Sequence, residues 1–144
     1  MSTRAAAAWD AEYASGRYRG EPPVAFARDI IDAARSRNLR RGPYIGCGNG
    51  RNFIPMSEAG LDLVGLDISA QAVAQLRQRR PAAAGLIVGG LGAVAPSARF
   101  ELGALTADGF TAVLPPRLDS TPHAPPGRGQ WSQWEAIWQR RRPA

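Results

Sequence analysis

A glycine-rich run, Gly46-Cys47-Gly48-Asn49-Gly50, and a single acid, Asp67, are the residues whose types and spacing could do chemistry. Glycines in such a turn adopt backbone angles that are closed to other residues, and they let a ligand approach the main chain closely. An acid about 20 residues further on, at the tip of the next strand, is placed to accept hydrogen bonds from ribose hydroxyls. Together these residues predict a site for a nucleoside-containing cofactor.

The elements needed to position these residues follow in order along the chain. Short apolar runs predict three strands, at residues 43–45, 61–66 and 86–88. Between them we expect two helices, at residues 52–59 and 70–79, with Gly60 ending the first and Ser69 capping the second. Strands that alternate with helices indicate a parallel sheet with right-handed crossovers. The predicted fold class is therefore α/β, a Rossmann-like parallel sheet with flanking helices.

Three parts are expected along the chain. Residues 1–41 are predicted to form N-terminal helices, the second of them from about Val24 to Arg37, and residues 42–114 form the cofactor-binding core, with a fourth strand at 110–114. Residues 115–144 contain 6 prolines among 30 residues and few aliphatic side chains, which predicts an irregular tail rich in Pro, Arg and Trp. In that tail the helical spacing of Trp131, Trp134 and Trp138 predicts a terminal helix. We expect this helix to cover a sheet face or to dock on a partner.

The glycine turn resembles the first motif of the class I S-adenosylmethionine-dependent methyltransferases, because its spacing is G-x-G-x-G and not the G-x-G-x-x-G of dinucleotide sites. The segment GLDLVGLDISAQAV, residues 60–73, is similar to the second strand and helix of that family. The segment Trp9-Asp10-Ala11-Glu12-Tyr13 resembles the leading helix of the small-molecule enzymes of the thiopurine or tellurite type. The resemblance covers residues 9–90.

The resemblance implies a role for each matching residue. Gly46, Gly48 and Gly50 would line the methionine and ribose portion of S-adenosylmethionine, with Cys47 and Asn49 between them in the same turn. Asp67 would bind the ribose hydroxyls, Ile68 would pack against adenine, and Tyr13 would help to close the cofactor pocket. Cys47 is expected to be a small packing residue and not a nucleophile, since no activating histidine is near it in the sequence. Neither a catalytic residue nor a metal site is predicted.

Three departures from the family pattern stand in the sequence. The acid that usually precedes the glycine turn by two positions is Tyr44, and the adenine-reading acid expected after the third strand is Gly90. A complete fold of this family needs roughly 200 residues at about 30 per strand-to-strand unit. The chain has 144. We therefore expect an incomplete methyltransferase fold, either truncated or frame-shifted beyond about residue 90.

The predicted function is S-adenosylmethionine-dependent methyl transfer to a small-molecule acceptor. One alternative is a non-catalytic, truncated remnant of the same family. The other is an NAD(P)-dependent oxidoreductase, against which the glycine spacing argues.

Composition limits the possible partners. All 18 basic residues are arginine and give a net charge of +6, but they are scattered along the chain, and a nucleic-acid partner is therefore not predicted. No apolar run approaches the roughly 20 residues that cross a bilayer, so a cytoplasmic protein without a membrane partner is expected. The lone histidine, His123, has no companion ligand nearby in the sequence.

Overall fold

The computed structural model describes residues 4–83, 85–89, 110–119 and 133–140. The chain divides into two compact units, Met1–Ala98 and Arg99–Ala144. Each unit has its own sheet, a three-stranded one in the first and a two-stranded one in the second.

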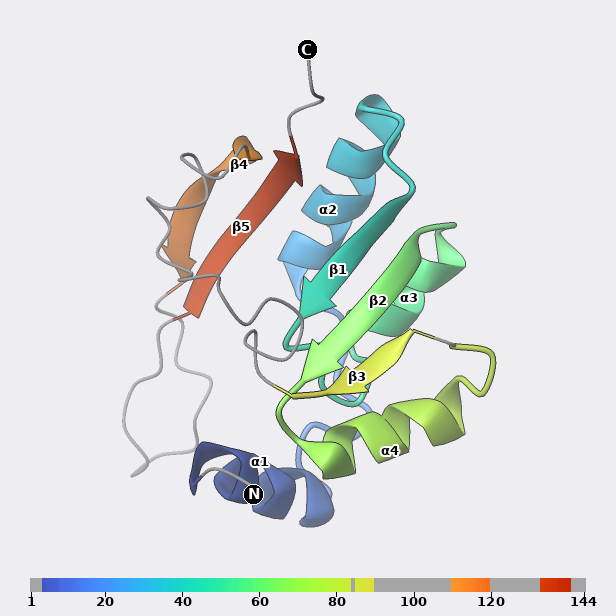
Figure 1. Cartoon of the computed structure of the whole chain (residues 1–144), viewed down its shortest axis with the longest axis vertical. Coiled ribbons are helices and arrows are strands. Elements are labelled where there is room, and N and C mark those ends of the chain that lie inside the picture. Colours follow the sequence, from blue (N-terminus) through green and yellow to red (C-terminus); the bar gives the residue numbers. More distant parts are fainter. Residues whose placement is uncertain (1–3, 84, 90–109, 120–132, 141–144) are drawn as a thin grey trace. The chain divides into compact units, whose positions relative to one another are not determined.

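The first unit begins with two helices and continues as alternating strands and helices (Figure 1). Its described elements are α1 (Arg4–Ala14), α2 (Ala25–Ser36), β1 (Arg41–Ile45), α3 (Phe53–Glu58), β2 (Asp62–Asp67), α4 (Ala70–Arg79) and β3 (Leu86–Val88). The strands are parallel and lie in the order β1-β2-β3, with Ile45 opposite Leu66 and Asp67 opposite Val88. The α/β fold predicted from the sequence is confirmed, in the form of a partial Rossmann-like sheet.

The core lies between the sheet and helices α3 and α4. Phe53 and Met56 of α3 and Val73 and Leu76 of α4 are each at most 1% exposed. Both pairs are three residues apart, a spacing that puts their side chains on the same side of a helix. These two helices therefore attach to the sheet mainly by apolar burial.

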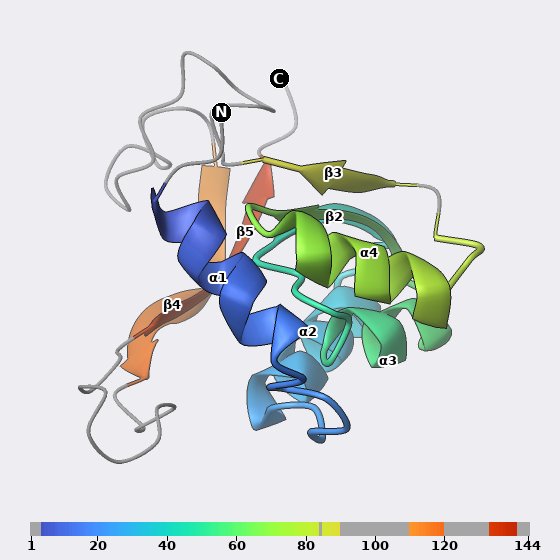
Figure 2. The ribbon, with the colours of Figure 1, turned by 90° about the horizontal axis from the view of Figure 1, so that it is seen from below.

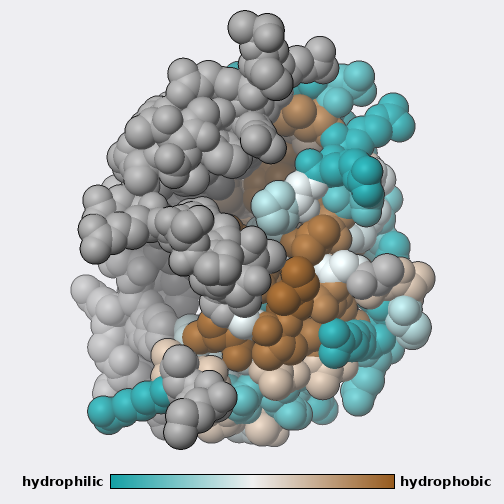
Figure 3. Space-filling model, in the orientation of Figure 1, coloured by the Kyte–Doolittle hydropathy of each residue, from teal (hydrophilic) through white to brown (hydrophobic). Residues whose placement is uncertain are grey.

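The opposite face of the sheet carries no helix among the described residues of the first unit. Figure 2 shows α2, α3 and α4 together on one side of the sheet. On the other side Ile45 is 52% and Val64 39% exposed, and Figure 3 shows apolar side chains gathered there. Parallel sheets usually have both faces covered, so the described part of this unit is only one half of such a layered arrangement.

Local signals in the sequence account for the limits of several elements. The helix predicted at 70–79 is confirmed, and the Ser69 hydroxyl accepts a hydrogen bond of 3.0 Å from the Ala72 N–H as its cap. Gly60 follows α3 with a φ of +94°, a conformation that glycine adopts without the penalty that a Cβ brings. The two helices expected within residues 1–41 are α1, which begins at Arg4, and α2, which ends at Ser36, one residue before the expected end.

The second unit contains strands where an irregular tail was expected. β4 (Phe110–Asp119) pairs antiparallel with β5 (Gln133–Arg140). The strand predicted at 110–114 is confirmed and continues to Asp119, across the expected boundary between core and tail. The irregular tail is therefore wrong for 115–119 and 133–140. The register shifts between Leu114 and Arg117, where two prolines cannot donate to the ladder.

The helix predicted around the tail tryptophans is also wrong. Trp134 and Trp138 lie in β5, opposite Leu118 and Ala112, and Trp131 lies outside the described residues. Tryptophan and isoleucine are good strand formers as well. Helical spacing over eight residues is therefore a weaker determinant than the ladder that β4 provides.

Candidate active site

The glycine turn is attached to the end of the neighbouring strand by main-chain hydrogen bonds. The N–H groups of Gly46 and Cys47 both donate to the Leu66 carbonyl oxygen, at 2.7 and 3.1 Å. Leu66 directly precedes Asp67, so the turn after β1 and the acid after β2 meet at the same edge of the sheet. The structure thus brings together the two features that the sequence singled out.

The Asp67 carboxylate is held by two main-chain donors. Gly48 N–H donates to Oδ2 at 2.7 Å and Ser69 N–H donates to Oδ1 at 2.9 Å. An ionised carboxylate has about four acceptor positions, so each oxygen keeps room for a further donor. Asp67 is therefore oriented by the protein and can still accept from two neighbouring hydroxyl groups.

The glycines of the turn face different surroundings. A Cβ on Gly48 would lie 2.5 Å from the Tyr13 hydroxyl oxygen, so the α1 phenol covers the turn at this point. A Cβ on Gly50 would lie 2.6 Å from a methyl carbon of Leu76 and 2.8 Å from one of Ile54. At Gly50 the side chains of the protein itself leave no space for a Cβ. At Gly48 the neighbours are instead the Tyr13 hydroxyl and the Asp67 carboxylate, which belong to the candidate site.

Asn49 joins the turn to neighbouring elements. Its side chain is only 3% exposed, and its amide nitrogen lies 3.4 Å from both the Tyr18 carbonyl oxygen and Gln75 Oε1. Its own carbonyl accepts a hydrogen bond of 2.8 Å from Arg79 Nη1. These contacts give Asn49 a structural role in the turn.

Cys47 points into the core. It is 3% exposed and belongs to the buried cluster that contains Phe53, Val73, Leu76 and Leu86. Burial raises the pKa of its thiol to about 12, and the nearby Asp67 carboxylate adds to this. The thiolate, which is the nucleophilic form, is therefore disfavoured.

We expect Cys47, the only cysteine of the chain, to resist thiol reagents in the native protein at neutral pH. Its folded pKa of about 12 exceeds the ordinary value of 9.0, so the stability it contributes is complete below pH 9 and is lost as pH rises towards 12. The slope is at most about 1.4 kcal/mol per pH unit. Chemical denaturation of wild type and Cys47→Ala between pH 9 and 12 measures this loss of stability, which only wild type should show. Rapid labelling of the thiol in the folded protein at neutral pH would contradict the predicted resistance.

Tyr44, which stands where the family has an acid, is turned partly into the protein. Its hydroxyl oxygen accepts a hydrogen bond of 3.1 Å from Asn52 Nδ2, and its ring packs against the buried cluster. Asn52 in turn accepts from the Val24 N–H at 3.0 Å. Tyr44 thus helps to connect β1 with the segments that precede α2 and α3. Gly90, at the second position of departure, lies outside the described residues.

Among the α1 residues that contact the glycine turn or Ser69, Tyr13 was predicted and Asp10 was not. Tyr13, the predicted one, covers Gly48, and burial together with the Asp67 carboxylate raises the pKa of its phenol. Asp10, one turn earlier, accepts a hydrogen bond of 2.6 Å from the Ser69 hydroxyl. The spacing of three between Asp10 and Tyr13 is the sequence signal that could have indicated a common face.

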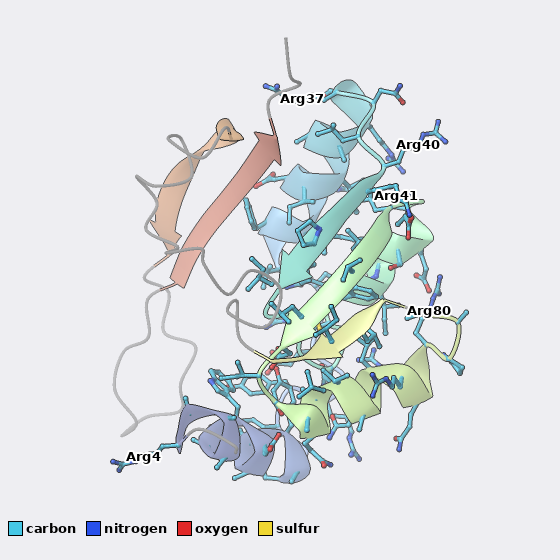
Figure 4. All side chains as sticks on the ribbon, viewed as in Figure 1. Arg4, Arg37, Arg40, Arg41 and Arg80 are labelled. Carbon is cyan, nitrogen blue, oxygen red and sulfur yellow. The ribbon has the colours of Figure 1, made fainter. Side chains whose placement is uncertain are left out.

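Three labelled arginines between the end of α2 and the start of β1 lie away from this site. Arg37, Arg40 and Arg41 project at the end of the sheet where β1 begins, whereas the glycine turn follows the other end of that strand (Figure 4). Among the residues that the structure describes, no three His, Cys, Asp or Glu side chains gather as metal ligands. None of the described helices is long and apolar enough to cross a membrane.

One family model matches part of the chain. Residues 44–101 match the family model described as "Methyltransferase domain", a segment that contains the glycine turn, β2, α4 and β3. A search of curated proteins finds no match to the chain. The matched segment is less than half of the chain, and its likeness to a methyltransferase domain agrees with the partial Rossmann-like sheet.

Proposed function

We propose that the chain binds S-adenosylmethionine at the glycine turn and transfers its methyl group to a small-molecule acceptor in the cytoplasm. The observation that carries the proposal is the Asp67 carboxylate, which Gly48 and Ser69 orient at the end of β2. It lies within the segment that matches a methyltransferase domain. Adjacent ribose hydroxyls are donors that suit the two acceptor positions left on this carboxylate.

The residues around Asp67 suit the remainder of the cofactor. Gly46 is exposed, and nothing lies within 4 Å of where its Cβ would be, so the main chain can be approached closely there. Ile68, next to Asp67, is partly exposed and offers an apolar surface for adenine. The N–H groups of Gly46, Cys47 and Gly48 already donate within the protein. The turn would therefore serve the cofactor mainly by letting it approach the main chain closely, and less by donating hydrogen bonds to it.

S-adenosylmethionine, when bound, supplies a methyl group already activated by a positively charged sulfur. The chain would then mainly orient the reactants and exclude water, effects that are together worth several kcal/mol in other enzymes. Tyr13 and its ring neighbours Trp9 and Tyr18, with centroids 5.4 to 6.2 Å apart, form an aromatic group beside the turn. Such a group suits exclusion of water near the reacting atoms.

A small acceptor is proposed over a nucleic acid because of where charge lies. The group Arg37, Arg40 and Arg41 projects at the end of the sheet opposite the glycine turn (Figure 4). A polyanion held there would be held away from Asp67, and the arginines nearer the turn bond within the protein, Arg79 to the Asn49 carbonyl oxygen and Arg51 to Glu21. The aromatic group beside Gly48 instead offers an apolar surface to a small organic molecule.

Calorimetric titration of the full chain tests the proposal. We expect micromolar binding of S-adenosylmethionine and much weaker binding of NAD. Tighter binding of NAD would overturn the proposal in favour of an oxidoreductase. Binding of S-adenosylmethionine without transfer of a labelled methyl group to any small acceptor would favour the non-catalytic remnant.

A further inference from the structure

The side chain of Asp10, on α1, contacts the start of α4. Its Oδ1 accepts hydrogen bonds from the Ser69 hydroxyl at 2.6 Å and from the Gln71 N–H at 3.0 Å. The first N–H groups of a helix have no partner within the helix and carry partial positive charge. A carboxylate is therefore a favourable partner at this position.

Ser69 connects this contact to Asp67. Its hydroxyl donates to Asp10, and its main-chain N–H donates to Asp67 Oδ1 at 2.9 Å. Asp67 in turn accepts from the Gly48 N–H, and Gly48 lies under the Tyr13 hydroxyl. Tyr13 follows Asp10 by three residues on α1. The contacts from Asp10 through Ser69, Asp67 and Gly48 therefore lead back to the helix on which they began.

Further contacts hold the same helix along α4. Gln75 Nε2 donates to the Tyr13 carbonyl oxygen at 2.9 Å. Figure 2 shows α1 beside α4, with its chain running on towards the segment that precedes α2. A shift of α1 would therefore disturb both the cover over Gly48 and the hydrogen bond that Ser69 gives to Asp67.

We infer that Asp10 is a positioning residue for cofactor binding, which acts through Ser69 to orient the Asp67 carboxylate and to keep Tyr13 over the turn. The inference rests on the proposed function, because the orientation of Asp67 matters only if this carboxylate binds the ligand. Asp10 itself need not touch the cofactor.

The negative charge of Asp10 is the property on which this role depends. The hydrogen bonds from Ser69 and Gln71 lower the pKa of its carboxyl group below the ordinary value, so it is ionised at neutral pH. Asparagine at this position keeps the shape and one acceptor oxygen but loses the charge. Hydrogen bonds to a charged acceptor are the stronger kind, and Asp10→Asn therefore weakens the contact without creating a cavity.

The test compares Asp10→Asn with Asp32→Asn, which removes the same charge from an exposed position on α2. We expect Asp10→Asn to raise the dissociation constant of S-adenosylmethionine about five- to tenfold, mainly through faster dissociation, and Asp32→Asn to leave it unchanged. Amide hydrogen exchange at Gln71 should accelerate in Asp10→Asn alone. Asp10→Glu, which keeps the charge on a longer side chain, should restore part of the affinity.

A double-mutant cycle with Ser69→Ala tests the route of the effect. If Asp10 acts through Ser69, Asp10→Asn costs less affinity in the Ser69→Ala background than in wild type. Equal cost in both backgrounds would overturn the inference. So would unchanged affinity in Asp10→Asn with accelerated exchange at Gln71, since Asp10 would then only fasten α1.

Failure of the proposed function gives a different result. Suppose that wild-type protein binds no S-adenosylmethionine, while its Gln71 amide is protected from exchange and loses this protection in Asp10→Asn. This result would overturn the proposed function. The contact between α1 and α4 would stand in that case as a structural one. Unchanged exchange at Gln71 in Asp10→Asn would overturn the inference whatever the ligand does.

Discussion

Replacing Asp67 by asparagine is expected to weaken S-adenosylmethionine binding at least about a hundredfold. Two hydroxyl donors to a carboxylate contribute about 1.5–3 kcal/mol each, and a factor of ten corresponds to about 1.4 kcal/mol. Asparagine has one acceptor oxygen, and its NH₂ group would face the N–H of either Gly48 or Ser69, both of which donate to the carboxylate. The substitution therefore removes one of the ligand's two acceptor oxygens, takes the charge from the other, and also disturbs the turn.

Asp62→Asn is the matched control for this substitution. Asp62 lies at the other end of the same strand, where its carboxylate pairs with Arg41 at 2.8 Å and is 64% exposed. Calorimetric titration of both variants, with thermal unfolding to show that both are folded, should give near-wild-type affinity for Asp62→Asn alone. A folded Asp67→Asn protein that binds with wild-type affinity would remove the basis of the site.

Replacing Gly50 by alanine is expected to destabilise the protein by about 2–5 kcal/mol. The residue has a φ of +98°, which a Cβ makes unfavourable by about 1–2 kcal/mol. The added carbon would also meet Leu76 and Ile54 at 2.6 and 2.8 Å. Leu76 is 0% exposed, so it has no solvent-filled space into which to move.

Gly60→Ala separates the two causes. Gly60 has a nearly equal φ of +94°, but nothing lies within 4 Å of its Cβ position. Chemical denaturation of the two variants should therefore give a loss in Gly50→Ala that exceeds the loss in Gly60→Ala by about 1–3 kcal/mol. Equal losses would mean that Gly50 is required for its backbone conformation alone.

The sequence predicts the sheet and its helices because their signals are local. Ser69 before an apolar pair three residues apart specifies the start and inward face of α4, and Gly60 marks the end of α3. The meeting of the glycine turn with Asp67 was also predictable, since carboxyl ends of adjacent parallel strands share one edge. These inferences needed no knowledge of contacts between distant residues.

Contacts between distant segments set the limit of prediction. Asp10 meets Ser69 across 59 positions, and Gly50, in the turn, is confined by Leu76 of α4. Neither pairing leaves a periodic signal. The strand at 133–140 was missed for a similar reason, since its ladder partner is β4 and the tryptophan spacing taken alone suggests a helix.

Amide NMR spectra of labelled protein, recorded during titration with S-adenosylmethionine, test the central claim most directly. The Gly48 and Ser69 N–H groups both donate to Asp67, so their signals report on whatever this carboxylate binds. We predict that these two signals shift together and saturate with the same dissociation constant that calorimetry gives. Saturation of shifts elsewhere in the chain, with the Gly48 and Ser69 signals unmoved, would contradict the account.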